Sequence, residues 1–302
     1  RAARQVGAEA YYTDYRELLA RPDIAIVDIC TPEFLHREQA VAAAEAGKHI
    51  LCEKPMADSL EAADALLAAA ERAGVKFMVG HSRRFTRRYR EVRAAIDAGA
   101  IGPVRLVREN ERRPRAMYSG LNLASDYWAP GGKPWISAAG YTLGAPLTTA
   151  VHETDLLRWF AGAEAESRIT DPEGEVSDFI TITIRFRNGA IGATEVVNRL
   201  PTGYPYFHQL EVFGQEGLIR ATDPTMVTLT DYRAEGLQQP INFATLLHID
   251  DAYAAELRGL TDAILDDTPM PMAPREARAA LAIALAAVRS SAEGRVVMMD
   301  ER

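Results

Sequence analysis

The chain has 302 residues and a mass of 33.1 kDa, enough for about two domains with a sizeable core. Its 34 basic and 42 acidic residues give a formal charge of −8, which argues against nonspecific binding to nucleic acid or to an anionic membrane. Cys30 and Cys52 are too few for a disulfide framework, and no run of about 18 apolar residues could span a membrane. We therefore expect a small-molecule or protein partner, no nucleic acid, no membrane, no metal and a reducing, cytoplasmic location.

The first part of the chain alternates between short apolar runs and helical patterns. Residues 24–30, 49–53 and 76–80 ("IAIVDIC", "HILCE" and "KFMVG") resemble strands that are buried on both faces. Helical patterns follow each of these runs, at 33–46, from Asp58 to Gly74 and at 87–98. Gly47 stands where a left-handed C-cap is favoured, and Asp58 with Glu61 is the start signal of the second helix. This alternation predicts a Rossmann-like, doubly wound parallel sheet.

After "GAIGPV" at 99–104 the pattern changes to that of an antiparallel sheet. Residues 179–186 ("FITITIRF") alternate strictly between apolar and polar, and Asn188-Gly189 supplies a hairpin turn. Further strands are expected at 208–214, 217–221 and 226–230, and further helices at 149–160, 251–266 and 274–290. We therefore predict a first domain over 1–102 and a second over 103–302, the second being an α/β domain with a large, open, mainly antiparallel meander.

The ordered motifs of the chain resemble the Gfo/Idh/MocA family of nicotinamide-dependent sugar and polyol oxidoreductases, in particular its inositol dehydrogenases. The motifs occur in the family's order: "TP", "AGKH", "EKP", "VGHSRRF", "GAIG", "VHETDLLRW" and "FGQEGLI". Family members also open with a βαβ unit that carries G-x-G-x-x-G, and this pattern is absent from the sequence. We therefore expect a fragment that lacks its first βαβ unit, the alternative being a degenerate protein that does not bind dinucleotide.

The resemblance implies an enzyme that uses NAD or NADP to move hydride between the nicotinamide and a CH–OH group of a sugar, an inositol or a related polyol. Such a reaction needs a base for the hydroxyl proton and a cation near the oxygen. The resemblance assigns the cation to Lys54, the base to His152, and a position beside the base, often Asp in the family, to Thr148. A hydroxyl such as that of Thr148 can hold a ring nitrogen but cannot stabilise imidazolium by charge.

The alternative for Lys54 is a solvated loop lysine, and the alternative for His152 is a structural histidine bonded to Asp155, one helical turn away. The resemblance implies cofactor contacts by Thr31, Pro32, His36, Glu53, Lys54 and Pro55. It implies substrate contacts by Arg83, Asp155, Tyr204 and Tyr206, with core packing an equal alternative for Tyr206. The run of Arg83, Arg84, Arg87, Arg88 and Arg90 could suggest an anion site, but most of it is interpreted as a solvated helix face.

The resemblance also implies a homodimer or homotetramer that assembles through the sheet of the second domain. Two other functions remain open. Relatives in the family open glycosidic bonds by transient oxidation with a retained cofactor, and a relative can also act as a regulatory protein that binds cofactor or sugar without turnover. Thr148 in place of Asp keeps the regulatory alternative open.

Overall fold

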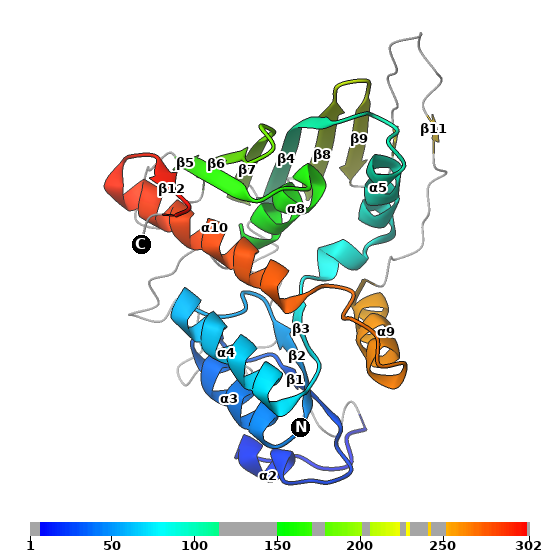
Figure 1. Ribbon diagram of the computed structural model, residues 1–302, viewed down its shortest axis with the longest axis vertical. Coiled ribbons are helices and arrows are strands. Elements are labelled where there is room, and N and C mark those ends of the chain that lie inside the picture. The colour runs from blue at the N-terminus through cyan, green and yellow to red at the C-terminus, as the bar shows by residue number, and fades with distance from the viewer. Residues whose placement is uncertain are drawn as a thin grey trace. The chain divides into compact units, whose positions relative to one another are not determined.

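The computed structural model describes residues 7–114, 150–170, 179–200, 206–223, 228–229, 241–242 and 252–300. The chain divides into two compact units (Figure 1). Unit 1 comprises Arg1–Gly80 and Gly259–Arg275, and unit 2 comprises His81–Arg258 and Glu276–Arg302. The predicted domain boundary near residue 102 lies within unit 2, and the assignment of domains to 1–102 and 103–302 stays a prediction.

Unit 1 contains the predicted parallel sheet. Its strands β1 (Ile26–Ile29), β2 (His49–Glu53) and β3 (Phe77–Gly80) lie in the order β1-β2-β3. All residues of β3 and the three central residues of β2 are buried, which explains why these strands read as continuous apolar runs. The Rossmann-like parallel arrangement that the sequence predicted is therefore confirmed.

The strands of unit 1 are connected by helices. The short helix α2 (Tyr15–Leu19) precedes the sheet, α3 (Glu33–Glu45) packs against β1 and β2, and α4 (Leu60–Ala73) lies alongside α3 (Figure 1). Gly47 adopts a left-handed φ of +70° after α3, as expected. The start of α4 differs by one residue from the prediction, because the hydroxyl of Ser59, and not Asp58, accepts the capping hydrogen bond from the Ala62 N–H at 3.2 Å.

A segment from the C-terminal part of the chain completes unit 1. It includes the end of α9 (Ala252–Leu265). The ammonium of Lys76 holds this segment through an ion pair with Asp267 at 2.8 Å and a hydrogen bond to the carbonyl oxygen of Thr268 at 3.0 Å. No pattern in the amino-acid sequence indicated that this segment returns to unit 1.

Unit 2 is built on a seven-stranded sheet with the order β12-β5-β6-β7-β4-β8-β9. The strands are β4 (Val104–Pro114), β5 (Ala165–Thr170), β6 (Phe179–Phe186), β7 (Ile191–Leu200), β8 (Phe207–Gly214), β9 (Leu218–Asp223) and β12 (Val297–Met298). Only the pairing of β4 with β7 is parallel among these strands, so the sheet is mainly antiparallel, as predicted. The predicted simple meander is wrong in one respect: β4, the first strand of the unit, lies between β7 and β8.

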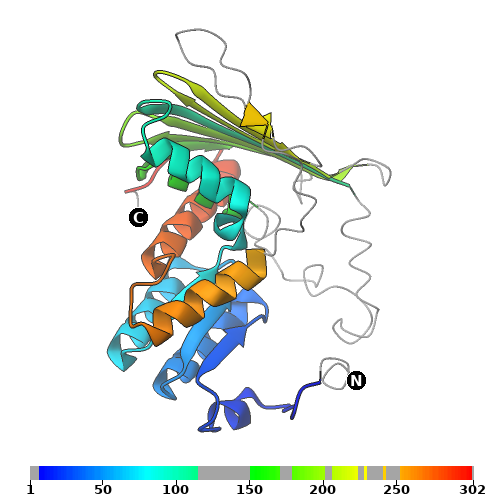
Figure 2. The ribbon, with the colours of Figure 1, turned by 90° about the vertical axis from the view of Figure 1, so that its right-hand side faces the viewer.

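Helices cover one face of this sheet (Figure 2). They are α5 (Arg87–Asp97), α8 (Val151–Ala161) and α10 (Pro274–Glu293). The alternation of β6 sends Ile180, Ile182, Ile184 and Phe186 into the core beneath them, where all four are buried. A short 3₁₀ helix, η1 (Ser82–Phe85), precedes α5, and the short strands β10 (Thr228–Leu229) and β11 (Ile241–Asn242) pair antiparallel.

The "GAIG" and "FGQEG" motifs meet in unit 2 and have a structural role. The Glu216 N–H donates to the carbonyl oxygen of Ile101 at 2.9 Å. A Cβ atom on Gly214 would lie 1.9 Å from that same oxygen, so only glycine fits there. These residues therefore fix the end of β8 against the start of β4.

Candidate functional site

The carboxyl edge of the unit 1 sheet gathers the predicted cofactor-binding residues. Thr31 and Pro32 follow β1, while Glu53 ends β2 and is followed by Lys54 and Pro55. The carboxyl ends of strands β1 and β2 lie side by side, because Ile29 at the end of β1 pairs with Cys52, one residue before the end of β2. In open α/β sheets this edge is where ligands bind. The structure therefore brings these residues to one edge of one unit.

Lys54 lies beside a partly buried carboxyl group. Its N–H donates to Glu53 Oε2 at 3.1 Å, and a Cβ atom on Gly80 would lie 3.5 Å from the same oxygen. Burial raises the pKa of Glu53, against the lowering effects of the Lys54 N–H and ammonium. Lys54 itself is only partly exposed. This environment differs from that of the solvated loop lysine considered as the alternative.

The start of α3 can receive an anionic group. Its N-cap residue is Pro32, which supplies no side-chain hydrogen bond to the first turn, and the buried, acidic Glu33 is the first residue of that turn. The Thr31 hydroxyl donates to Gln39 Oε1 at 2.6 Å, which leaves its oxygen lone pairs as acceptors. Thr31, Pro32 and the Lys54 ammonium thus form a set of groups that fits a dinucleotide, and these residues would hold it.

His36 is placed differently from the prediction of a direct cofactor contact. Its ring is buried, with Nε2 2.7 Å from the carbonyl oxygen of Thr31 and Nδ1 3.1 Å from that of Pro55. Cys52 Sγ lies 3.3 Å from Nδ1. Both ring nitrogens are thus directed at groups of the protein, and this geometry favours a role in holding the two loops.

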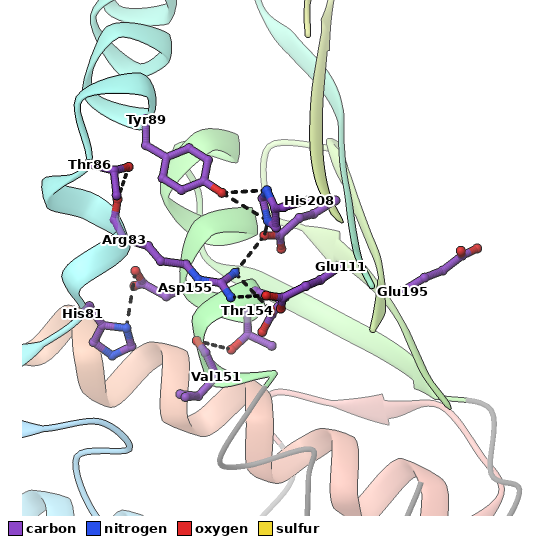
Figure 3. A network of polar contacts seen from close by, with 12 residues as sticks. His81, Arg83, Thr86, Tyr89, Glu111, Val151, Thr154, Asp155, Glu195 and His208 are labelled. Atoms are coloured by element: carbon purple, nitrogen blue, oxygen red, sulfur yellow. Dashed lines mark hydrogen bonds and ion pairs between the residues drawn. The ribbon is translucent and has the colours of Figure 1, made fainter. Parts of the chain in front are cut away.

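In unit 2, Arg83 stands at the centre of a buried network that we call the Arg83 cluster (Figure 3). Its guanidinium contacts Glu109 at 3.2 Å, Glu111 at 2.8 Å and Glu153 at 3.0 Å, and all three glutamates are almost completely buried. The Tyr206 hydroxyl donates to Glu111 Oε1 at 2.6 Å. The structure therefore joins two predicted substrate-binding residues, Arg83 and Tyr206, through a carboxylate that the sequence analysis missed.

The cluster contains a second arginine, and the pKa values of two of its carboxyl groups are shifted in opposite directions. Arg113 donates to Glu111 Oε2 at 2.6 Å. Burial works to raise the pKa of Glu111, but the Arg83 guanidinium, a hydrogen bond from Glu153 and Arg113 together hold that pKa well below its usual range. Burial raises the pKa of Glu153 well above its usual range, opposed by Arg83 and reinforced by the charge of Glu111. These shifts favour the neutral form of Glu153 and the charged form of Glu111.

A histidine and a tyrosine complete the Arg83 cluster. His208 on β8 contacts Glu109 through Nε2, and the Tyr89 hydroxyl on α5 lies 2.9 Å from His208 Nδ1 (Figure 3). Burial lowers the pKa of His208, although Glu109 works against this effect. The cluster residues come from η1, α5, β4, α8 and the start of β8, so no local sequence pattern could have united them.

Asp155, a predicted substrate contact, is committed to another arginine. Arg84 binds its two carboxylate oxygens at 2.7 and 2.6 Å. His81 Nδ1 lies 3.6 Å from Oδ2 (Figure 3). Burial would raise the pKa of Asp155, but Arg84 and His81 hold it below its usual value. Arg84 is itself buried, so the expectation of a solvated helix face is wrong at this position. The predicted substrate contact by Asp155 stays a prediction.

His152, the predicted base, is partly exposed on α8. The His81 ring stands edge-on to the His152 ring, with 6.0 Å between the ring centroids. His81 thus lies near both His152 and Asp155, and a hydrogen bond between His152 and Asp155 stays a prediction. Thr148 and Tyr204 lie outside the described residues, so their predicted roles stay predictions.

The residues that the structure describes contain neither a metal-binding cluster nor a membrane-spanning helix. No group of three or more His, Cys, Asp or Glu side chains in these ranges is arranged to hold a metal ion. No helix within the same ranges combines the length and the apolar character needed to cross a membrane.

Comparison with known protein families decides the identity of the two parts of the chain. Residues 1–81 match the model "Oxidoreductase family, NAD-binding Rossmann fold", and residues 89–220 match the model "GFO/IDH/MocA C-terminal domain". The chain belongs to the Gfo/Idh/MocA family. It is therefore an NAD-binding oxidoreductase, and the predicted family, fold class, dehydrogenase type and cofactor, NAD or NADP, are confirmed.

Several Gfo/Idh/MocA proteins resemble the chain over nearly its whole length. The inositol 2-dehydrogenase of Rhizobium meliloti is 30% identical, across 98% of this chain and 88% of that protein. The myo-inositol 2-dehydrogenase of Thermotoga maritima is 29% identical, across 98% of this chain and 86% of that protein. A levoglucosan dehydrogenase solved in complex with NADH and L-sorbose has a TM-score of 0.82 and 26% identity, covering 100% of this chain and 86% of that one.

Proposed function

We propose that this dehydrogenase transfers hydride between NAD or NADP and the CH–OH carbon of a sugar, an inositol or a related polyol. The observation that carries the proposal is the position of Lys54, which follows β2 at the ligand-binding edge of the parallel sheet and lies against Glu53. The relatives support the class of substrate, since they include inositol dehydrogenases and a structure that holds NADH with a sugar.

The chemistry requires two protein groups. When bound, the oxidised nicotinamide accepts the hydride that leaves the carbinol carbon. Lys54 stabilises the negative charge that grows on the reacting oxygen, and His152 takes the hydroxyl proton, so that the C–OH group becomes C=O. Thr148 keeps its predicted place beside His152, and Arg83, Asp155, Tyr204 and Tyr206 keep their predicted place around the substrate.

The test is steady-state turnover with NAD and NADP against a panel of inositols, aldoses and anhydrosugars. Lys54→Met removes the charge while it keeps most of the side-chain volume, and we expect it to lower kcat by about 100-fold or more. Lys76→Met is the matched control, because Lys76 belongs to the same unit and pairs with Asp267, away from the carboxyl edge of the sheet. The control is expected to retain the kcat of the wild type.

Three outcomes contradict the proposal. Equal kcat in the Lys54→Met variant and the wild type would remove the role given to Lys54. Binding of NADH and sugar without turnover would favour the regulatory alternative. Cleavage of a glycoside with no net change in cofactor absorbance would favour a redox-assisted glycosidase.

The proposal includes a cytoplasmic location and a homodimer or homotetramer that assembles through the unit 2 sheet. The described helices α5, α8 and α10 pack on one face of this sheet, and Ile191 on β7 is exposed. Light scattering with size-exclusion chromatography checks the assembly. We expect Ile191→Glu to shift the wild-type oligomer toward smaller species, and a wild type that is monomeric at micromolar concentration would contradict it.

A further inference from the structure

The buried ring of His36 contacts both loops that carry the proposed cofactor contacts. One contact is with Thr31, in the loop after β1, and the other is with Pro55, in the turn that contains Lys54. The exposed fraction of His36 is only 1%, so the ring acts from within the unit. Any effect of His36 on the cofactor or the substrate must therefore pass through these two loops.

The position of the ring proton follows from the partners. Both ring nitrogens face carbonyl oxygens, and the Nε2 contact with the Thr31 oxygen, at 2.7 Å, is shorter than the Nδ1 contact with the Pro55 oxygen, at 3.1 Å, so we assign the N–H to Nε2. On the other side of the ring, burial raises the pKa of the Cys52 thiol well above its usual range, so the thiol keeps its proton. Its sulfur lies 3.3 Å from Nδ1 and can donate to it. With its N–H on Nε2, His36 donates to the Thr31 carbonyl oxygen, and its Nδ1 lies beside the Cys52 thiol and the Pro55 carbonyl group.

We propose that His36 is a positioning residue that holds the Thr31 loop, through the Nε2 hydrogen bond, in a fixed place relative to the Lys54 turn packed on the same ring. The ring has two separable functions. Its donor restrains the Thr31 loop, which serves cofactor binding, and its volume supports the turn at Pro55, which serves the placement of Lys54. The kinetic readout of this inference rests on the proposed function, while the structural readout does not.

Three substitutions at His36 separate the donor from the volume. His36→Leu keeps most of the volume and removes the donor, and we expect the KM for the cofactor to rise roughly 3- to 10-fold with kcat nearly unchanged. His36→Ala removes both, and we expect kcat to fall as well. His36→Gln restores an N–H near the position of Nε2, and we expect it to return the KM to within about threefold of the wild type.

His49→Gln is the matched control. His49 is a partly buried histidine of the same unit, and its Nδ1 accepts the Lys76 N–H at 3.0 Å at the opposite end of β2. This control is expected to change thermal stability but neither KM nor kcat. If His36 were merely structural, its variants would behave in the same way, with a lower Tm, no separation of KM from kcat and no rescue by glutamine.

Hydrogen exchange of the cofactor-free protein tests the same inference without turnover. We expect His36→Leu to speed exchange in the Thr31 loop, including the Leu35 N–H that donates to the Pro32 carbonyl oxygen at 2.9 Å, and to leave exchange at Met56 and Ala57 unchanged, whereas His36→Ala speeds both. If this pattern appears and the wild type turns over no polyol, the proposed function fails and the positioning role stands. Equal exchange in His36→Leu and the wild type, or an unchanged KM in an active His36→Leu enzyme, overturns the positioning role.

Discussion

In unit 1 the buried imidazole of His36 is set among main-chain carbonyl oxygens and a thiol, whereas unit 2 buries the Arg83 cluster of guanidinium and carboxyl groups. The partners of His36 are main-chain atoms that the parallel sheet already places. The members of the Arg83 cluster instead balance one another's charges, so each depends on the rest. We therefore expect substitutions in unit 1 to act on loops, and substitutions in the cluster to act on the stability of the whole unit.

We expect the largest effect on α8, where the partly exposed His152 precedes the buried Glu153. We expect His152→Ala to lower kcat by about 10²- to 10⁴-fold, because it removes the proposed base, and to abolish the base limb of the pH profile of kcat/KM. The neighbouring Glu153→Gln substitution is the control and is expected to retain that limb. Thr148→Asp should move the limb to higher pH, since a carboxylate favours imidazolium. A His152→Ala enzyme with the wild-type profile would show that His152 is not the base.

Arg83→Met tests whether the cluster depends on its central cation. Removing the guanidinium leaves Glu109 and Glu111 buried without their main counter-charge, and we expect a loss of about 3–5 kcal/mol in the free energy of unfolding. Arg87→Met is the matched control, because Arg87 is exposed and pairs with Glu91 on the helix surface, and its cost should stay within about 0.5 kcal/mol. Urea unfolding measures both. Similar values for the two variants would mean that the cluster is dispensable for stability.

Asp155→Asn tests a buried pair that lies outside the Arg83 cluster. The amide keeps one acceptor for Arg84 but loses the charge, so we expect a cost of about 1.5–3 kcal/mol at neutral pH. The folded-state pKa of Asp155 is depressed, so its stabilising contribution is present above the unfolded value of about 3.9 and is lost as the pH falls through the folded pKa. The stability difference between the two proteins should therefore shrink in acid. A pH-independent difference would contradict the charged pair.

Glu153→Gln has the smallest expected effect, because the raised pKa of Glu153 favours a neutral carboxyl group in the folded protein. Glutamine keeps an acceptor for Arg83 and supplies an N–H for Glu111. The raised pKa of Glu153 means that the wild type loses stability as the pH rises from about 4.3, the unfolded value, toward the folded pKa. The variant should thus be at least as stable as the wild type at neutral pH, with an advantage that grows through this window. Strong destabilisation at neutral pH would show that the Glu153 carboxyl is ionised.

The sequence determined the local elements and the unit 1 edge. The runs that became β1, β2 and β3 were apolar because both faces of a parallel sheet are buried, and Gly47 and Gly189 marked turns that need positive φ. The pairs Thr31-Pro32 and Lys54-Pro55 follow the carboxyl ends of the adjacent strands β1 and β2, so their meeting follows from strand order alone. For that reason the proposed cofactor contacts and Lys54 could be predicted from motifs.

Only the tertiary structure decided the buried contacts of unit 2 and the completion of unit 1. The placement of β4 between β7 and β8 brings Glu109 and Glu111 to Arg83 and His208, and the segment 259–275 joins unit 1 through Lys76. A charged residue in a sequence is predicted to be exposed, because burying an isolated charge costs free energy. Its burial is tolerated only when distant residues supply the opposite charge. Arg84 was misjudged for this reason, and His36 appeared as a cofactor contact because its main-chain partners leave no trace in the amino-acid sequence.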